Sequence, residues 1–175
     1  MSESSKKHKA VAPSQLNFVI FVCSTSRYQQ QKDGVKIEDV SGYLIESLVK
    51  ASGHKVLFKK IIPDDKTQIQ NAVKKFLGSS DLDVIVFCGG TGIAPSDVTI
   101  EAVTPFLEKT LPGFGEIFRH LSFNKVGSAV MLSRAAAGVA KGKALFCIPG
   151  SPEAVRFSVE TLILPEASHI VRHAR

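Results

Sequence analysis

Three short apolar runs that do not alternate with polar residues constrain the fold of this chain most. They span Asn17–Cys23, Asp83–Cys88 and Lys143–Ile148, and they contain mainly β-branched, aromatic and other apolar side chains. A strand with one solvated face alternates between apolar and polar residues, whereas a strand covered on both faces does not. These runs therefore predict three strands in the buried interior of a sheet.

Helical segments separate the predicted strands. Apolar residues recur at helical spacing over 39–51 and from Asp65 to about Leu77, and a fourth apolar strand over His54–Ile62 lies between these two helices. Strands that alternate with helices predict an α/β fold in three layers, with a mostly parallel twisted sheet and helices on both faces. Ligands of such sheets bind outside the carboxyl ends of the strands, so functional residues are expected in the loops there.

Local patterns predict further elements. The polar stretch from Gln29 to Gly34 predicts a loop, and Thr99 is expected to be the N-cap of the helix that follows it. Gly113 and Gly115 interrupt the apolar pattern, which predicts that only a short helix around Phe118 comes after them.

The length and composition suit one globular domain. The chain has 175 residues, of which 44% are hydrophobic and 22% charged, and these values exclude disordered and fibrous classes. We predict a disordered polar tail over 1–15 and a single domain over 16–175. The sequence has no apolar run of about 18 residues and no signal-like segment near its start. We therefore expect a cytoplasmic protein without membrane contact.

The net charge of +6 is concentrated near the two ends of the chain. Three lysines against one glutamate give +2 in residues 1–16, and two arginines give +2 in the last four residues. A nucleic-acid-binding domain would instead carry a basic face on the fold itself, so no nucleic-acid partner is expected. Cys23, Cys88 and Cys147 are far apart in the sequence, which predicts buried free thiols rather than a zinc site.

The Gly-rich loop that follows the second buried run is the strongest candidate for a binding site. It consists of Gly89, Gly90, Thr91 and Gly92. Glycines let backbone N–H groups approach an anion and form a nest that favours phosphate, and Thr91 adds a hydroxyl donor. A helix N-terminus near Thr99 could add a positive dipole end. A tight turn that simply needs glycines is the alternative, and the four residues alone leave it open.

Two carboxylates are predicted at the same edge of the sheet. Asp97 follows the Gly-rich loop, where a Mg²⁺ ligand is expected, because magnesium binds carboxylates together with waters and substrate phosphates. Asp64 follows the strand His54–Ile62 and could face a metal or a bound ligand. As alternatives, Asp97 helps to cap the helix at Thr99, and Asp64 forms an Asx-type turn beside Asp65, the cap of the next helix.

The loop after the last buried run can also bind an anion. Gly150 permits close approach of a ligand, and Ser151 offers an N–H and a hydroxyl, with Pro149 before them. A turn with Ser151 as the N-cap and Pro152 as the first helical residue is the alternative.

The loop after the first run contains small hydroxyls and a cation. Ser24, Ser26 and Arg27 suit phosphate binding, and a solvated loop is the alternative. His169 and His173 have a spacing that can bind metal, but no third ligand is evident, so a solvated helix end is expected.

Together, these motifs resemble the core of the MoaB/MogA family. The matching segments are Phe87–Gly92, Ser96–Thr99 with Glu101-Ala102, Leu111–Glu116, Met131–Arg134 and Pro149–Pro152, with Asp39, Ser41-Gly42 and Ile62–Asp64 upstream. The resemblance extends over about residues 16–172 and implies a parallel-rich α/β fold.

The resemblance implies a molybdopterin adenylyltransferase of molybdenum cofactor biosynthesis. The terminal phosphate of molybdopterin would attack the α-phosphate of ATP with Mg²⁺ present, and a MoeA-type metal insertase would receive the AMP-molybdopterin. Asp64 and Asp97 match the family's functional carboxylates, with Asp97 as the Mg²⁺ ligand. The residues that would hold phosphates and pterin are Ser24, Ser26, Arg27, Gly89, Gly90, Thr91, Gly92, Thr99, Pro149, Gly150 and Ser151. A homotrimer or homohexamer is implied as well.

Two departures from the family pattern bear on this prediction. Ser26 stands near a position where the family often has an aspartate, and the chain lacks the longer C-terminal extension of some MogA members, which favours the MoaB branch. The same domain also occurs as a binding module, so a non-catalytic molybdopterin-binding or scaffold module of the pathway is the alternative. The presence of both Asp64 and Asp97 favours the enzyme.

Overall fold

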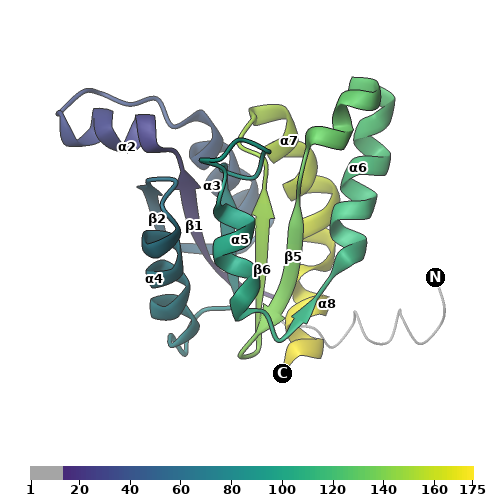
Figure 1. Cartoon of the computed structure of the whole chain (residues 1–175). Helices are drawn as coiled ribbons and strands as arrows, with labels where there is room; N and C mark the ends of the chain where they lie inside the picture. The colour runs from purple at the N-terminus through teal and green to yellow at the C-terminus, as the bar shows by residue number, and fades with distance from the viewer. Residues whose placement is uncertain (1–13) are drawn as a thin grey trace.

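A six-stranded sheet lies between two layers of helices (Figure 1) in this computed structural model, which describes residues 14–175. Nearly all of the tail predicted over 1–15 lies outside the described residues. The strand order is β2-β1-β3-β6-β5-β4. The strands are β1 (Asn17–Cys23), β2 (Lys55–Ile62), β3 (Val84–Cys88), β4 (Lys109–Thr110), β5 (Ala136–Ala140) and β6 (Lys143–Ile148).

The sheet is mostly parallel, as predicted. Strands β2, β1, β3 and β6 run parallel to one another, whereas β5 pairs with β6 and with β4 in antiparallel fashion. Parallel neighbours require crossover connections, and helices supply them. The helices are α2 (Thr25–Lys32), α3 (Val40–Ala51), α4 (Lys66–Leu77), α5 (Thr99–Val103), α6 (Pro112–Val126), α7 (Pro152–Phe157) and α8 (Leu164–Ala174), with 3₁₀ segments η1 (Thr104–Phe106) and η2 (Gly127–Leu132) and a π segment η3 (Ser158–Ile163) between α7 and α8.

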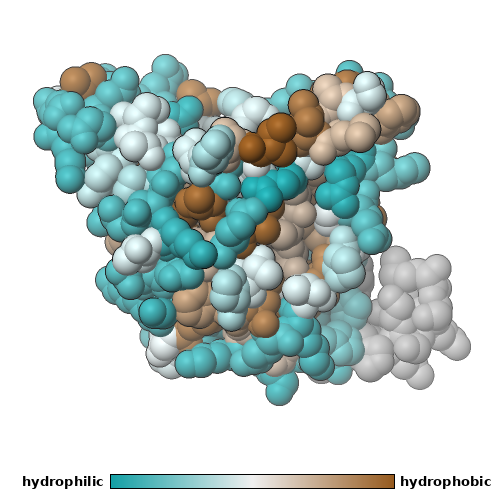
Figure 2. All heavy atoms as spheres, in the orientation of Figure 1, coloured by the Kyte–Doolittle hydropathy of each residue, from teal (hydrophilic) through white to brown (hydrophobic). Residues whose placement is uncertain are grey.

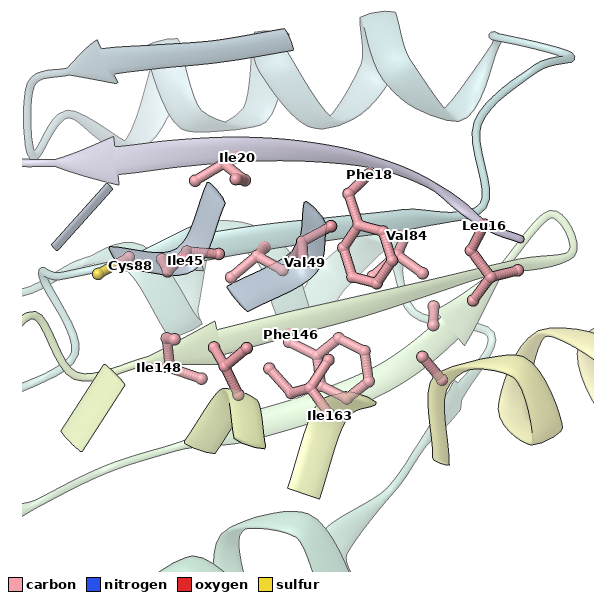
Figure 3. Packing of buried hydrophobic residues seen from close by; sticks show 14 of the residues in the cluster. Leu16, Phe18, Ile20, Ile45, Val49, Val84, Cys88, Phe146, Ile148 and Ile163 are labelled. Atoms are coloured by element: carbon pink, nitrogen blue, oxygen red, sulfur yellow. The ribbon is translucent and has the colours of Figure 1, made fainter. Parts of the chain in front are cut away.

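Helices cover both faces of the three central strands, which explains why the sequences of β1, β3 and β6 do not alternate. On one face, side chains of α3, η3 and α8 pack against the strands, with Phe18 and Phe146 at the centre of the contact (Figure 3). On the other face, α4 and α5 pack against strand residues that include Phe21 and Phe87, whose rings stack at 5.2 Å between centroids. Figure 1 shows α4 and α5 in front of the sheet.

Two sequence predictions about helices were wrong. The stretch from Gln29 to Gly34 lies largely in α2, a helix without a buried residue, so no apolar stripe marks it in the sequence. Helix α6 begins at Pro112 and includes Gly113 and Gly115 rather than starting after them. Glycine is required at position 115 of this helix, because a Cβ there would lie 2.5 Å from the carbonyl oxygen of Ala135.

The strand β5 was not anticipated. Its residues are small, Ala-Ala-Gly-Val-Ala, and lack the bulk that marks the other strands. A Cβ on Gly138 would lie 2.6 Å from the carbonyl oxygen of Lys109, so a small residue lets β4 approach β5 closely. No helix within residues 14–175 is long and apolar enough to cross a membrane.

Candidate active site

The carboxyl ends of β1, β2, β3 and β6 meet at one edge of the sheet, at the top of Figure 1. The register pairs Cys23 with Ile62 across β1 and β2, and Cys88 with Ile148 across β3 and β6. Backbone hydrogen bonds extend this contact into the loops, from Ser24 N to Ile62 O at 2.9 Å and from Gly89 N to Ile148 O at 2.9 Å. The four predicted loops are therefore neighbours.

Asp64 presents one free carboxylate oxygen to this edge. Its Oδ2 accepts hydrogen bonds from Thr25 N at 2.8 Å and Thr25 Oγ1 at 3.2 Å, and its own N–H donates to Thr25 Oγ1 at 3.0 Å. Its Oδ1 is buried without a hydrogen-bond partner among the described residues. The partner of Asp64 thus comes from the start of α2 rather than from a local Asx turn. The cap of α4 is Asp65, as predicted, which accepts from Gln68 N at 2.8 Å.

The free oxygen of Asp64 faces Gly90 and Thr99. Gly90 has φ +61°, and a Cβ on it would lie 2.6 Å from Asp64 Oδ1 and 2.5 Å from Thr99 Oγ1. The Thr99 hydroxyl is also buried without a hydrogen-bond partner in residues 14–175. Buried polar atoms are normally hydrogen-bonded, so two unpartnered oxygens beside one glycine indicate a place for a bound group.

Thr99 is not the predicted N-cap. The residue at the cap position of α5 is Val98, and no side chain bonds to the N–H groups of that helix end. Thr99 is the first helical residue, and its N–H donates to Gly90 O at 2.9 Å. Because α5 has only five residues, the contribution expected from its dipole is small.

Asp97 bonds back to the segment that follows the Gly-rich loop and does not cap the helix. Its Oδ2 accepts a hydrogen bond from Ala94 N at 2.9 Å, and its N–H donates to Ala94 O at 2.8 Å. A Cβ on Gly92 would lie 2.7 Å from Asp97 Oδ2, so glycine is needed where the loop folds over this carboxylate. The capping alternative for Asp97 is therefore wrong.

An ion pair that the sequence did not predict borders the loop. Both terminal nitrogens of Arg134 donate to the carboxylate of Glu101, one of them to Oε2 at 3.2 Å. The guanidinium beside Glu101 holds the pKa of that carboxyl below its usual range. The two residues are 33 positions apart, and no sequence pattern other than the family resemblance connects them.

The residues after β1 form a helix start rather than a loop. Ser24 caps α2 by accepting a hydrogen bond from Arg27 N at 3.5 Å, and its hydroxyl lies 3.3 Å from that of Ser26. Burial raises the pKa of Cys88 at the end of β3, and the guanidinium of Arg27 is close enough to oppose that shift. Arg27 lies in the first turn of α2, which begins directly after β1 at this edge of the sheet.

The loop after β6 is tied to the same edge. Ser151 accepts a hydrogen bond from Ala154 N at 3.4 Å and caps α7, with Pro152 as the first helical residue, as predicted. The buried hydroxyl of Ser41 donates to Gly150 O at 2.7 Å. A cavity between α6 and α7 opens beside this loop, and its lining includes Phe118, Ser122, Lys125, Pro149, Ser151 and Phe157.

Comparisons with known proteins assign the family. A family model described as a probable molybdopterin binding domain matches residues 19–169. Molybdenum cofactor biosynthesis protein B of Halalkalibacterium halodurans is 44% identical over 170 residues, which cover 97% of this chain and 96% of that protein. The chain belongs to the MoaB/MogA family.

Other members of the MoaB/MogA family show the same likeness. A protein of Methanocaldococcus jannaschii named probable molybdopterin adenylyltransferase is 41% identical over 160 residues, covering 91% of this chain and 94% of the relative. The crystal structure of the tungsten cofactor synthesizing protein MoaB from Pyrococcus furiosus aligns with a TM-score of 0.82 and 38% identity, over 94% of this chain and 99% of that chain. The family resemblance and the fold predicted from the sequence are both confirmed.

The side chains at this edge fit a magnesium ion better than a zinc ion. Within the part of the chain that the structure describes, no three Cys, His, Asp or Glu side chains are grouped to hold a metal. Magnesium needs only one or two carboxylates, because waters and substrate phosphates complete its ligands. The unpartnered Oδ1 of Asp64 is an oxygen of the required kind.

The predicted thiols and histidines are not part of the site chemistry. Cys23, Cys88 and Cys147 are buried free cysteines, as predicted, and burial raises the pKa of Cys23 to about 12. A thiol with such a pKa is not a thiolate nucleophile near neutral pH. His169 pairs with Glu166 on α8 at 3.1 Å, far along the chain from the four loops.

Proposed function

We propose that the protein is an adenylyltransferase that joins the AMP moiety of ATP to the terminal phosphate of molybdopterin. The observation that carries the proposal is the pair of buried, unpartnered oxygens of Asp64 and Thr99 beside Gly90. These atoms lie at the carboxyl edge of the sheet, where α/β folds bind their ligands. The name of the Methanocaldococcus jannaschii relative, probable molybdopterin adenylyltransferase, supports the same activity.

The reaction needs positioning more than a protein nucleophile. A phosphate oxygen of molybdopterin attacks the α-phosphorus of ATP, a new phosphoanhydride bond forms, and the bond to the β-phosphate breaks to release pyrophosphate. The two reactants are anions that repel each other, so donors and cations must hold them together. The N–H groups of the Gly89–Gly92 loop, the Thr99 hydroxyl and the Arg27 guanidinium are the groups available for this.

Asp97 and Asp64 are the residues that would hold Mg²⁺, which neutralises phosphate charge when it is bound. Asp97 follows the Gly-rich loop and lies beside Gly92, and Asp64 follows β2 and lies beside Gly90, so both carboxylates border the loop that would bind phosphate. Thr25 fixes the orientation of Asp64 by bonding only its Oδ2, which leaves Oδ1 directed at Gly90. The pterin would lie toward Pro149, Gly150 and Ser151, beside the cavity between α6 and α7.

Asp97→Asn is expected to remove most of the rate of pyrophosphate release from ATP, molybdopterin and Mg²⁺. The amide oxygen of asparagine can still accept from Ala94 N, so the loop keeps its shape while the negative charge is lost. The loss is expected to be on the order of 100-fold. Asp81→Asn, at an exposed position before β3, is the control and keeps the wild-type rate. A wild-type rate in Asp97→Asn would remove Asp97 from the reaction.

The same assay separates the enzyme from a binding-only module of the pathway. A calorimetric titration in which molybdopterin binds to the wild-type protein, without any product when ATP and Mg²⁺ are added, would favour the module. If AMP-molybdopterin forms, the acceptor of this product is a MoeA-type metal insertase, which consumes it in the next step.

We also propose a trimer-based assembly, as a homotrimer or homohexamer. Exposed apolar side chains gather where α6 ends and η2 follows, and they are Phe123, Val126, Met131 and Leu132. Figure 2 shows this apolar surface over the upper end of α6. Sedimentation velocity is expected to find three or six times the chain mass of 18.9 kDa. Leu132→Asp is expected to dissociate the assembly, and a monomeric wild-type protein would contradict the proposal.

A further inference from the structure

Arg134 is bonded to the backbone of the Gly-rich loop as well as to Glu101. Its Nε donates to Thr91 O at 3.0 Å and to Gly92 O at 2.9 Å, and one terminal nitrogen reaches Asp97 O at 3.4 Å. Arg134 lies in the segment that joins η2 to β5, so none of these contacts is local in sequence. One guanidinium thus binds three carbonyl groups of a loop that has no regular secondary structure.

The direction of these carbonyl groups determines the direction of the neighbouring N–H groups. The described residues contain no cis peptide bond. In a trans peptide the C=O of one residue and the N–H of the next point in opposite directions. Because the carbonyls of Thr91 and Gly92 point to Arg134, the N–H groups of Gly92 and Ile93 point away from it. Within residues 14–175, neither of these N–H groups has a hydrogen-bond acceptor.

Glu101 keeps Arg134 in this place and offsets its charge. The carboxylate of Glu101, on α5, binds both terminal nitrogens of the guanidinium. A bidentate pair of this kind is geometrically specific, and a lysine cannot reproduce it. Most of the five N–H groups of the guanidinium donate to backbone carbonyls and to Glu101. The side chain therefore supports the loop and is not available to bind phosphate directly.

We infer that Arg134, held by Glu101, is a positioning residue that aims the N–H groups of Gly92 and Ile93 at an oxyanion of the phosphate substrate. The inference rests on the proposed function for the identity of the substrate, but the class of ligand, a phosphate or diphosphate anion, follows from the N–H groups themselves. The Arg134–Glu101 pair thereby preorganises the loop for substrate binding.

Pyrophosphate binding tests the inference without any turnover. The wild-type protein is titrated with pyrophosphate and Mg²⁺ by calorimetry, and the amide signals of Gly92 and Ile93 are followed by ¹H–¹⁵N NMR. These two signals are expected to shift in the wild-type protein. Arg134→Gln and Arg134→Lys are both expected to weaken pyrophosphate binding at least tenfold and to remove the two shifts. Guanidinium ion added to Arg134→Ala is expected to restore part of the affinity, which a merely structural defect would not allow.

Arg156 and Glu160 supply the matched control. They form an exposed Arg–Glu ion pair between α7 and η3 at 2.9 Å, and neither residue has been assigned a role in the site, so Arg156→Gln is expected to leave pyrophosphate affinity unchanged. If Arg134→Gln unfolds, Glu101→Gln provides the second variant, and it is expected to weaken binding in the same direction. Wild-type affinity in a folded Arg134 or Glu101 variant would overturn the inference. A wild-type protein that shows the two shifts but forms no AMP-molybdopterin would contradict the proposed function and leave the inference standing.

Discussion

Asp64→Asn is expected to lower the rate of pyrophosphate release by on the order of 100-fold and to leave the fold intact. The asparagine oxygen can keep the two hydrogen bonds from Thr25 that Asp64 Oδ2 accepts. The amide nitrogen then replaces Oδ1, so a donor stands beside Gly90 where the wild-type protein has an anionic acceptor. A cation, or a donor group of the substrate, loses its partner at that point.

The neighbouring Asp65 is the control for this substitution. Asp65 accepts from Gln68 N as the N-cap of α4, and asparagine caps helices as well as aspartate does. Asp65→Asn is therefore expected to keep both stability and rate. The measurement is the initial rate of pyrophosphate release at saturating ATP, with circular dichroism to compare the folds. A loss of less than about threefold in Asp64→Asn would show that its carboxylate is not part of the reaction.

Gly89→Ala is expected to destabilise the fold strongly, because its Cβ would overlap the carbonyl oxygen of Cys23 and its φ is +101°. Neither Gly89 nor Cys23 can move easily, since Cys23 ends β1 and Gly89 N is bonded to β6. A non-glycine residue in the left-handed region costs about 1–2 kcal/mol, and the steric overlap adds about 1–3 kcal/mol. Urea unfolding should therefore show a lower free energy of unfolding.

Gly53 separates the two causes of this destabilisation. It has φ +82°, but a Cβ on it would meet no atom within 4 Å. Gly53→Ala is therefore expected to lose only the conformational part, about 1–2 kcal/mol. Equal losses in Gly53→Ala and Gly89→Ala would mean that the contact between Gly89 and Cys23 relaxes at no cost.

The central strands and the fold class follow from the sequence because burial on both faces leaves a direct mark on it. Phe18, Val86 and Phe146 lie in runs that do not alternate with polar residues, and each is fully buried in the structure. The caps Asp65 and Ser151 were also predictable, because a cap acts within three residues of its own position. The family motifs marked the loops for the same reason, since each motif is contiguous.

The elements that were missed carry no such local mark. Helix α2 has no buried residue, and β5 is built of small residues that pair only because β6 offers a free edge. Thr99 has the composition of an N-cap, but its hydroxyl faces Gly90 and Asp64 instead. For β5 and Thr99, a partner distant in the sequence decides the outcome.

A mostly parallel α/β sheet, with a Gly-rich loop and two carboxylates after its strands, could be predicted from the residues alone, because strand burial, capping and loop composition are local properties. Which atoms contact one another depends on the tertiary fold. Thr25 occupies one oxygen of Asp64 and leaves the other beside Gly90 and Thr99, and Arg134 binds the carbonyls of a loop about 40 residues earlier in the chain. These contacts depend on strand order and register, which bring together residues that lie far apart in the chain. No local sequence pattern therefore predicts them.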